Sequence, residues 1–169
     1  MIMTEQQAKR LEAACRRFLH DILLMEVGDS LLVYIDGGSD ASLAESIVAT
    51  ARAMGMVADS MPLQRYSDLS AQTAALRAAI QRADYRVLCE LSETYLYPSG
   101  IWAEAVRAGR RVYSAGPIDA ECFQRCITSI DYSALAAMGD AIKQLVSRAR
   151  NVRVTSYAGT QLTCRMQPH

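Results

Sequence analysis

Residues capable of chemistry are concentrated in LSETYLYPSG, residues 91–100, where carboxylate, hydroxyl and phenol side chains follow a short apolar run. Glu93 could exchange a proton, and Tyr95 and Tyr97 could supply rigid contact area with hydrogen-bonding tips. A second polar group, DGGSD at residues 36–40, also follows an apolar run. These residue types suit either proton transfer between Glu93 and Asp36 or binding of an extended polar ligand.

Other catalytic arrangements find weaker support. A nucleophilic triad needs a histidine beside a serine, but His20 lies inside the first expected helix and His169 is the last residue. DGGS lacks the spacing of the dinucleotide fingerprint and of the phosphate loop. Binding is therefore favoured over catalysis. We predict no catalytic residue, no metal ligand and no cofactor.

Short apolar runs alternate with helical patterns along most of the chain. Strands are expected at residues 30–35, 56–60, 85–90 and 111–114, with helices before, between and after them. Thr4 and Gln7 have the capping-box spacing, and Asp131 can cap a long helix with a buried side made of Leu135, Met138, Ile142, Leu145 and Ala149. The alternation predicts an α/β fold with a mainly parallel, Rossmann-like sheet flanked by helices on both faces.

The rhythm changes near the end of the chain. Apolar and polar residues alternate in two runs, one that begins at Val152 and one that ends at Met166, on either side of an Ala158–Gly159 turn. This pattern predicts a half-buried C-terminal antiparallel hairpin added to the sheet. No linker separates it from the rest, so residues 1–169 are expected to form a single α/β domain.

The expected site is the carboxyl edge of the parallel sheet, where ligands bind in this class of fold. Four loops reach that edge, at residues 36–40, 63–66, 91–100 and 114–118. The candidate ligand-binding residues in them are Asp36, Gly37, Gly38, Tyr66, Ser92, Glu93, Tyr95, Tyr97 and Ser114.

Composition limits the partners. The chain has 169 residues, 51% of them hydrophobic, and its 18 basic and 18 acidic residues cancel. No net field attracts nucleic acid or an anionic membrane, and no apolar run is long enough to span a bilayer. A polar N-terminus argues against a signal peptide, so a cytoplasmic location is expected. The five scattered cysteines are interpreted as reduced core thiols.

Four stretches carry a resemblance to a known family. They are ADYRVLCELS, AEAVRAGRRVYSAGPID, IDYSALAAMGDAIKQLVSRA and NVRVTSYAGTQLTCRM. In order and spacing they resemble the N-terminal domain of the aminopeptidase T family of metallopeptidases, to which the dihydroxypyridine ring-cleaving dioxygenases are related. The resemblance extends from about Leu11 to Met166. The loop after the third strand departs from the family pattern, and only Ser92 roughly keeps it.

The resemblance implies a domain that covers an active site for a peptide or a small aromatic substrate. In that family the metal ligands belong to a C-terminal domain, and none can be carried over to a residue of this chain. The leading hypothesis is a non-catalytic peptide-binding protein derived from an aminopeptidase-like fold, with presentation of the peptide to a modifying enzyme as one open role. The alternative is the substrate-binding part of a metal-dependent hydrolase or dioxygenase whose metal domain is on another chain or removed.

A second surface could bind the peptide instead. The edge of the expected hairpin can accept an extended strand or pair with another copy of the chain. Exposed apolar residues there favour a homodimer. The residues of this peptide-edge or dimer surface are Val152, Val154, Leu162, Cys164 and Met166.

Overall fold

The computed structural model describes residues 4–62, 69–82, 84–94 and 100–166. The chain divides into two compact units, residues 1–129 and 130–169. Each unit is described by itself below. The expectation of a single domain stays a prediction.

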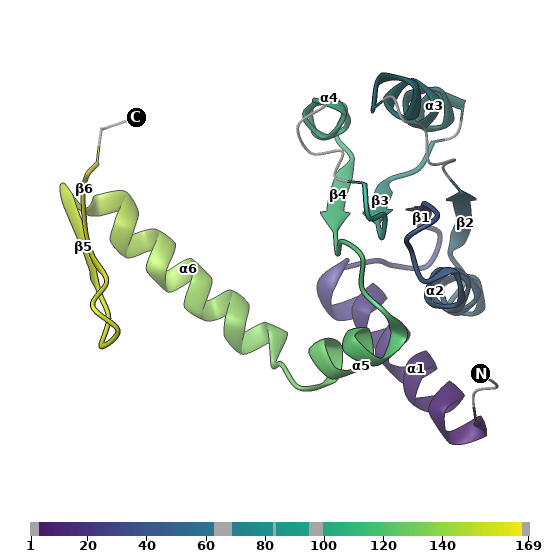
Figure 1. Cartoon of the computed structure of the whole chain (residues 1–169), viewed down its shortest axis with the longest axis horizontal. Coiled ribbons are helices and arrows are strands. Elements are labelled where there is room, and N and C mark those ends of the chain that lie inside the picture. Colours follow the sequence, from purple (N-terminus) through teal and green to yellow (C-terminus); the bar gives the residue numbers. More distant parts are fainter. Residues whose placement is uncertain (1–3, 63–68, 83, 95–99, 167–169) are drawn as a thin grey trace. The chain divides into compact units, whose positions relative to one another are not determined.

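The first unit contains a four-stranded parallel sheet in the order β2-β1-β3-β4 (Figure 1). Its strands are β1 (Ser30–Ile35), β2 (Val57–Pro62), β3 (Val87–Glu90) and β4 (Arg111–Ser114). The expected bounds of β1 and β4 are confirmed. β2 begins one residue and β3 two residues later than expected, and β2 ends at Pro62. Strand β1 is central, with Leu31 paired to both Ala58 and Val87.

Helices cover both faces of this sheet, as the alternating pattern predicted. Figure 1 shows α3 and α4 on one face, and α1, α2 and α5 on the other. Their bounds are α1 (Glu5–Arg17), α2 (Ala41–Ala53), α3 (Leu69–Arg82), α4 (Ile101–Arg107) and α5 (Ala120–Thr128). The predicted capping box of α1 is confirmed, because Thr4 accepts from the Gln7 amide while the Gln7 side chain accepts from the Thr4 amide. A π-helical turn, η1 (Phe18–Ile22), extends α1.

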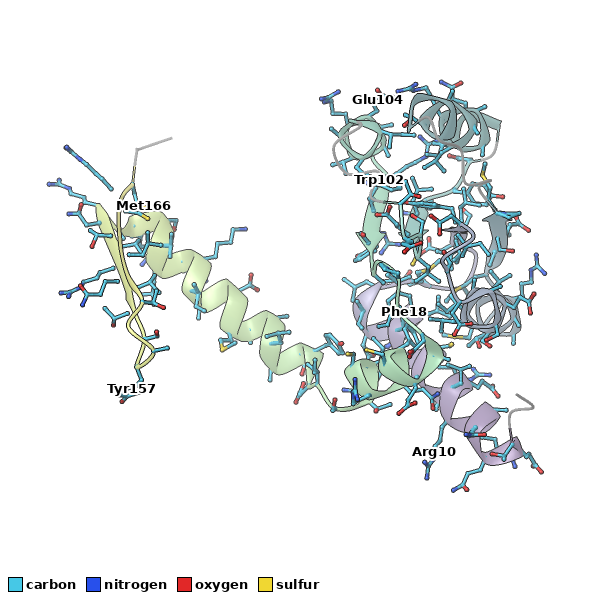
Figure 2. The ribbon with its side chains drawn as sticks, viewed as in Figure 1. Arg10, Phe18, Trp102, Glu104, Tyr157 and Met166 are labelled. Carbon is cyan, nitrogen blue, oxygen red and sulfur yellow. The ribbon has the colours of Figure 1, made fainter. Side chains whose placement is uncertain are left out.

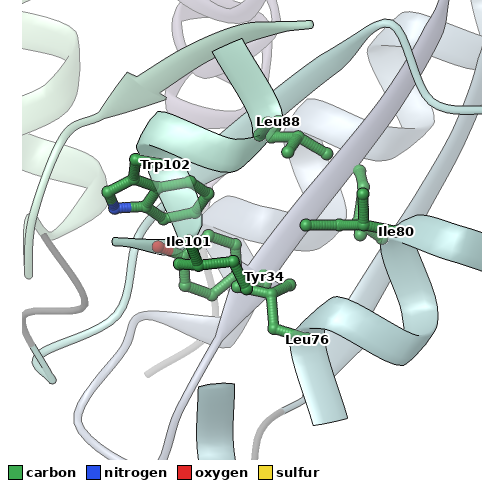
Figure 3. Close-up of a cluster of buried hydrophobic side chains, with 8 residues drawn as sticks. Tyr34, Leu76, Ile80, Leu88, Ile101 and Trp102 are labelled. Atoms are coloured by element: carbon green, nitrogen blue, oxygen red, sulfur yellow. The ribbon is translucent and has the colours of Figure 1, made fainter. Parts of the chain in front are cut away.

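The core has two layers because side chains of a buried strand alternate between its faces. On one face Leu32, Tyr34 and Leu88 pack against residues of α3 and α4, including Leu76, Ile80, Ile101 and Trp102 (Figure 3). On the other face α2 packs against β1 and β2, and α1 packs against α2 and α5. Phe18, labelled in Figure 2, meets Phe123 edge to face there, with ring centroids 5.2 Å apart.

A buried aspartate holds the amino edge of the sheet. Asp29 precedes β1, and its carboxylate oxygens lie 2.7 Å from Arg86 Nη1 and 3.0 Å from Arg111 Nη2. Arg111 begins β4 and also donates to the carbonyls of Leu23 and Leu24. One carboxylate therefore ties the start of β1 to the starts of β3 and β4.

The second unit consists of one helix and one hairpin. α6 (Tyr132–Arg148) begins with Asp131, whose side chain accepts from the Ala134 amide, as predicted. β5 (Asn151–Thr155) and β6 (Gln161–Arg165) pair antiparallel, and Gly159 has a φ of 93° in the connecting turn. Figure 2 shows Tyr157 at this turn.

Two expectations about this unit are wrong. The hairpin forms a separate two-stranded sheet and is not added to the parallel sheet. It is also not half-buried, and α6 has no buried residue among the described ones. The four large apolar side chains of the expected buried stripe are 46% to 73% exposed: Leu135, Met138, Ile142 and Leu145. Amphipathic spacing identified the stripe, but burial requires a covering surface, and the described residues of this unit do not provide one.

The cysteine assignment is also only partly correct. Cys15 and Cys89 are buried, as core thiols should be. Cys122 is partly exposed, and Cys126 and Cys164 are exposed. Their small apolar character did not determine their burial, because the helix face and hairpin that carry them lie at the surface. Within the described ranges, no helix has the length and apolar character needed to cross a membrane.

Replacing Asp29 should weaken the whole first unit. Asp29→Ala leaves the two arginines without their shared carboxylate, and we expect a loss of about 2 to 3 kcal/mol in unfolding free energy, measured by urea denaturation. Asp84→Ala is the matched control, because the described contact of Asp84 is made by its main-chain carbonyl. Equal unfolding midpoints for the two variants would show that the Asp29 contacts contribute little.

Candidate ligand-binding site

The strand order creates a switch point between β1 and β3. The chain leaves β1 for β2 on one side and later crosses to β3 on the other side. Figure 1 shows that the helices following these two strands, α2 and α4, cover opposite faces of the sheet. Loops that leave for opposite faces diverge at the carboxyl edge, and this is where open α/β sheets bind ligands.

Asp36 joins the two loops at this switch point. Its Oδ1 accepts from the Gly38 amide at 3.1 Å, the Ser39 hydroxyl at 3.0 Å and the Glu93 amide at 3.0 Å. Its Oδ2 accepts from the Thr94 amide at 2.9 Å and the Thr94 hydroxyl at 2.7 Å. The side chain is thus occupied in holding the loop after β1 against the loop after β3. This arrangement does not suit the acid or base role that the sequence left open for Asp36.

The hydrogen bonds outweigh burial in setting the ionisation of Asp36. Burial by itself raises the pKa of this carboxyl group. The Thr94 hydroxyl and the amides of Glu93, Thr94 and Gly38 all stabilise the charged form, and they lower the pKa to about 2. Asp36 is therefore a fixed negative charge at physiological pH.

Asp40 extends this connection to a third loop. Its Oδ1 accepts from the amides of Ser42 and Leu43 and so caps α2, while its Oδ2 accepts from the Ala120 amide at 3.0 Å. Ala120 is the first residue of α5, which follows the loop after β4. Two aspartates of one loop therefore hold the loops after β1, β3 and β4 together.

Next to Asp36, the exposed residues that the structure describes are a glycine pair and one glutamate. Gly37, Gly38 and Glu93 are all exposed. The Glu93 side chain lies directly against Gly38, where an added Cβ atom would overlap the Glu93 carboxylate. Glycine at position 38 thus allows the two loops to approach closely. A ligand at the rim would meet peptide groups of the glycine pair and the Glu93 charge.

Beneath the rim lies a polar cluster that sequence reasoning missed. Glu90, at the end of β3, is only 1% exposed, and the Ser92 hydroxyl lies 3.1 Å from Glu90 Oε1. Tyr34 is paired in register with Glu90 on the neighbouring strand. Burial, and then the adjacent Glu90 carboxylate, raise the pKa of Tyr34. A charged residue ending an otherwise apolar strand was the available signal for Glu90.

Two donors in this cluster lack a hydrogen-bond acceptor among the described residues. They are the Tyr34 hydroxyl and Trp102 Nε1, and both atoms are buried. The two rings pack with centroids 5.3 Å apart, and Figure 3 shows the hydroxyl and the indole nitrogen on the same side of the cluster. The layer between the sheet and helices α3 and α4 is otherwise apolar, and these buried polar atoms lie in the part of it beneath the switch point.

The remaining candidate residues fall into three groups. Ser92 is buried and its hydroxyl contacts Glu90 and the Thr94 carbonyl, so it supports the loop from inside. Ser114 is exposed at the end of β4. Tyr66, Tyr95 and Tyr97 lie outside the described residues. Their assignment as ligand-binding residues stays a prediction.

The apolar residues of the candidate hairpin surface lie on one face of the hairpin, as the alternating pattern suggested. Val152 pairs with Cys164 and Val154 with Leu162, which places these four residues on one face. Val154, Leu162 and Cys164 are exposed, whereas Val152 and Met166 are partly exposed. The outer edges of β5 and β6 have no partner strand among the described residues.

A groove of about 360 Å³ lies elsewhere in the first unit, between α1 and α2. Most of the side chains that line it are small, and its one charged residue, Glu12, is paired with Arg16 on the same helix. The described ranges hold no group of three or more His, Cys, Asp or Glu residues placed to share a metal ion. Of the described regions, the switch point has the denser arrangement of polar groups.

Comparisons with known proteins show the fold. No protein-family model and no curated protein sequence matches the chain. Its structure is similar to that of 2,5-dihydroxypyridine dioxygenase from Pseudomonas putida KT2440, with a TM-score of 0.68 and 16% sequence identity. The match covers 99% of this chain and 49% of that one, so this chain spans about half the length of the dioxygenase. The expected relation to this fold is confirmed, whereas membership of the aminopeptidase T family stays a proposal.

Two further solved structures are more distant. VinN in complex with L-aspartate has a TM-score of 0.42 and 15% identity, over 96% of this chain and 40% of that one. A sigma-54 interaction domain protein from Enterococcus faecalis has a TM-score of 0.39 and 12% identity, over 74% of this chain and 100% of that one.

Replacing Asp36 should change how the unfolding free energy depends on pH. In Asp36→Asn one acceptor oxygen becomes an NH₂ group that faces donors, and we expect a loss of about 2 to 3 kcal/mol in unfolding free energy at pH 7. Because the pKa of Asp36 is depressed in the folded state, its contribution is full above the unfolded pKa of about 4. It is lost as the pH falls toward the folded pKa of about 2.

The measurement is urea denaturation of both proteins between pH 2 and pH 7. The gap in stability between the original protein and Asp36→Asn should stay constant from pH 7 to about pH 5 and narrow below pH 4. Asp140→Asn, on exposed α6, is the matched loss of one carboxylate and should show little gap at any pH. A gap independent of pH down to 2 would contradict the role assigned to Asp36.

Proposed function

We propose that this chain is a non-catalytic binding protein that holds a peptide at the switch point between β1 and β3. The observation that carries the proposal is the set of three loops joined by Asp36 and Asp40. A rim whose loops are already tied together loses little conformational entropy when a ligand binds. The described carboxylate at its centre, Asp36, is used to hold the loops and is unsuited to proton transfer.

The chemistry of the rim supports a peptide ligand. A peptide offers amide donors and carbonyl acceptors for the exposed Gly37–Gly38 main chain, and its amino terminus or a basic side chain suits the Glu93 carboxylate. Tyr95 and Tyr97 follow directly along the same loop and would add contact area. We propose that the bound peptide is presented to a modifying enzyme, which would approach the carboxyl edge of the sheet.

The hairpin remains the alternative peptide site. Strand addition to β5 or β6 would use their outer edges, and the face with Val154 and Leu162 would contact alternate side chains of the peptide. The switch point is preferred because its polar groups are fixed by buried contacts, whereas the hairpin residues are mostly exposed.

A second candidate function rests on the fold similarity. Since 99% of this chain superimposes on half of a dioxygenase, the chain could supply the substrate-binding part of a metal-dependent dioxygenase or hydrolase. The metal domain would then belong to another chain or to a further part of the same protein. Copurification of a metal-binding partner that confers hydrolase or dioxygenase activity would favour this function over the binding protein.

We further propose a homodimer formed through the second unit. Leu135, Met138, Ile142 and Leu145 repeat along one stripe of α6, and burial of such a stripe is what stabilises most amphipathic helices. A unit of this size with no buried helix residue gains little from its own contacts. A second copy offers the same apolar stripe, which is suited to a twofold helix contact.

The tyrosines provide the test of peptide binding. Trp102 is the single tryptophan of the chain and packs beneath the switch point, so its fluorescence should report occupancy during titration with a peptide library. Tyr95→Ala and Tyr97→Ala should each weaken binding of a selected peptide by about 1 to 3 kcal/mol, as removal of an aromatic anchor does.

Matched variants separate the two sites. Tyr157→Ala removes an exposed tyrosine in the hairpin turn and should leave affinity unchanged. Leu162→Glu should likewise have no effect if the switch point is the site, and should abolish binding if the hairpin is. Unaltered affinity in both Tyr95→Ala and Tyr97→Ala would reject the switch point as the peptide site.

The oligomeric state tests the role of α6. Light scattering after gel filtration should give about twice the 18.6 kDa chain mass. Leu145→Glu places a charge in the proposed contact and should yield a monomer, whereas Gln144→Glu adds the same charge to the neighbouring position and should stay dimeric. A monomeric original protein at high concentration would refute the dimer.

A further inference from the structure

Two cysteines lie side by side on the surface of α5. Cys122 and Cys126 are four residues apart, and their Sγ atoms are 3.9 Å from each other. Cys122 is partly exposed and Cys126 is exposed, so solvent reaches the pair. The Asp119 side chain accepts from the Cys122 amide at 2.7 Å and fixes the first turn of the helix. Neither sulfur takes part in the proposed peptide site.

The spacing of the sulfurs suits a bridging ion. Metal–thiolate bonds are about 2.3 Å long, so two sulfurs 3.9 Å apart would subtend an angle of about 116° at a shared ion. This value lies between the tetrahedral and trigonal angles, and closer to the trigonal one. Both thiolates could therefore coordinate one ion with little change in the helix.

A disulfide fits the same pair less well. Cβ atoms four residues apart on a helix are about 5 to 6 Å apart, whereas a disulfide needs about 3.5 to 4.5 Å. Closing the S–S bond would also require the distance between the two sulfurs to fall by almost half. Oxidation would thus distort α5, while coordination of an ion would not.

The ligand types and the neighbouring residues indicate which kind of ion the two cysteines would bind. Thiolates prefer soft ions such as Cu(I), and disfavour Mg²⁺ and Ca²⁺, which take oxygen ligands. A closed zinc site normally takes four protein ligands, but the described residues contain no group of three or more His, Cys, Asp or Glu that could share an ion. Arg125 Nη2 lies 3.8 Å from Cys122 Sγ and can offset the negative charge of a dithiolate.

We propose that Cys122 and Cys126 form an open two-thiolate site for Cu(I). Each thiol loses its proton to solvent as its sulfur bonds to the ion, and copper stays in the same oxidation state. Two thiolates and one Cu(I) carry a net charge of −1, which Arg125 faces. The third coordination position stays open to an exogenous ligand, so the ion can exchange with thiol donors in solution.

The test is Cu(I) titration of the reduced full chain against a coloured Cu(I) chelator, under anaerobic conditions with glutathione present. The original protein should take up one Cu(I) per chain. Cys122→Ser and Cys126→Ser should each weaken uptake by roughly 100-fold or more, because a single thiolate loses the advantage of two linked ligands. A parallel Zn²⁺ titration should show weaker retention than Cu(I).

Cys164→Ser is the matched control, since Cys164 is an exposed cysteine on the hairpin and should be dispensable. Cys15 and Cys89 should not compete, because both side chains are buried and an ion in solvent does not reach them. Circular dichroism would verify that each variant is folded, and Cys→Ala replacements would repeat the test if a serine variant is not. Uptake that persists in both single variants, or that depends on Cys164, would overturn the site. Zinc held more tightly than Cu(I) would overturn the choice of ion.

Discussion

The carboxylate of Asp36 is the contact on which the arrangement of the sheet edge depends. Parallel strands are joined by long crossovers, so the loops at one edge come from distant parts of the sequence and have no local reason to meet. Here one side chain accepts hydrogen bonds from its own loop and from the loop after β3, 57 and 58 residues away. Asp29 has the corresponding position at the other end of β1, where it links the starts of β3 and β4. The central strand therefore has an anionic anchor at each end.

The two anchors act in different ways. Asp29 meets guanidinium groups, so it joins the strands by charge pairing at a partly hydrated edge. Asp36 accepts hydrogen bonds from amides and hydroxyls. These donors are uncharged and do not neutralise its carboxylate, which remains negative near the exposed Glu93. Asp36 and Glu93 thus place two carboxylates at the carboxyl edge near the switch point, and the proposed ligand would present a cationic or hydrogen-donating group to them.

Sequence patterns predicted the features that depend on neighbours along the chain. The strand at residues 30–35, the capping box at Thr4 and the Asp131 cap follow from short-range chemistry, and all three are present. The parallel strands and the carboxyl edge to which the candidate site was assigned also follow from the alternation of elements, whereas the site itself stays a proposal. The roles of Asp36 and Ser92 were not predictable, because their orientation depends on partners on other loops. The exposure of α6 was missed for a related reason, since spacing identifies an apolar stripe but not what covers it.

The sequence separation of the Asp36 contacts also bears on how the protein folds. β1 can pair with β2 soon after both are synthesised, but the bonds from Glu93 and Thr94 to Asp36 require closure of a much longer loop. Closing that loop is rewarded only when β3 docks beside β1, with α3 and α4 completing the apolar layer. The sheet edge should therefore be among the later parts to form, and partly folded chains would have helices and a β1–β2 pair without the joined loops of the proposed site. A ligand bound at the proposed site would then select completed molecules over folding intermediates, even where both have similar helical content.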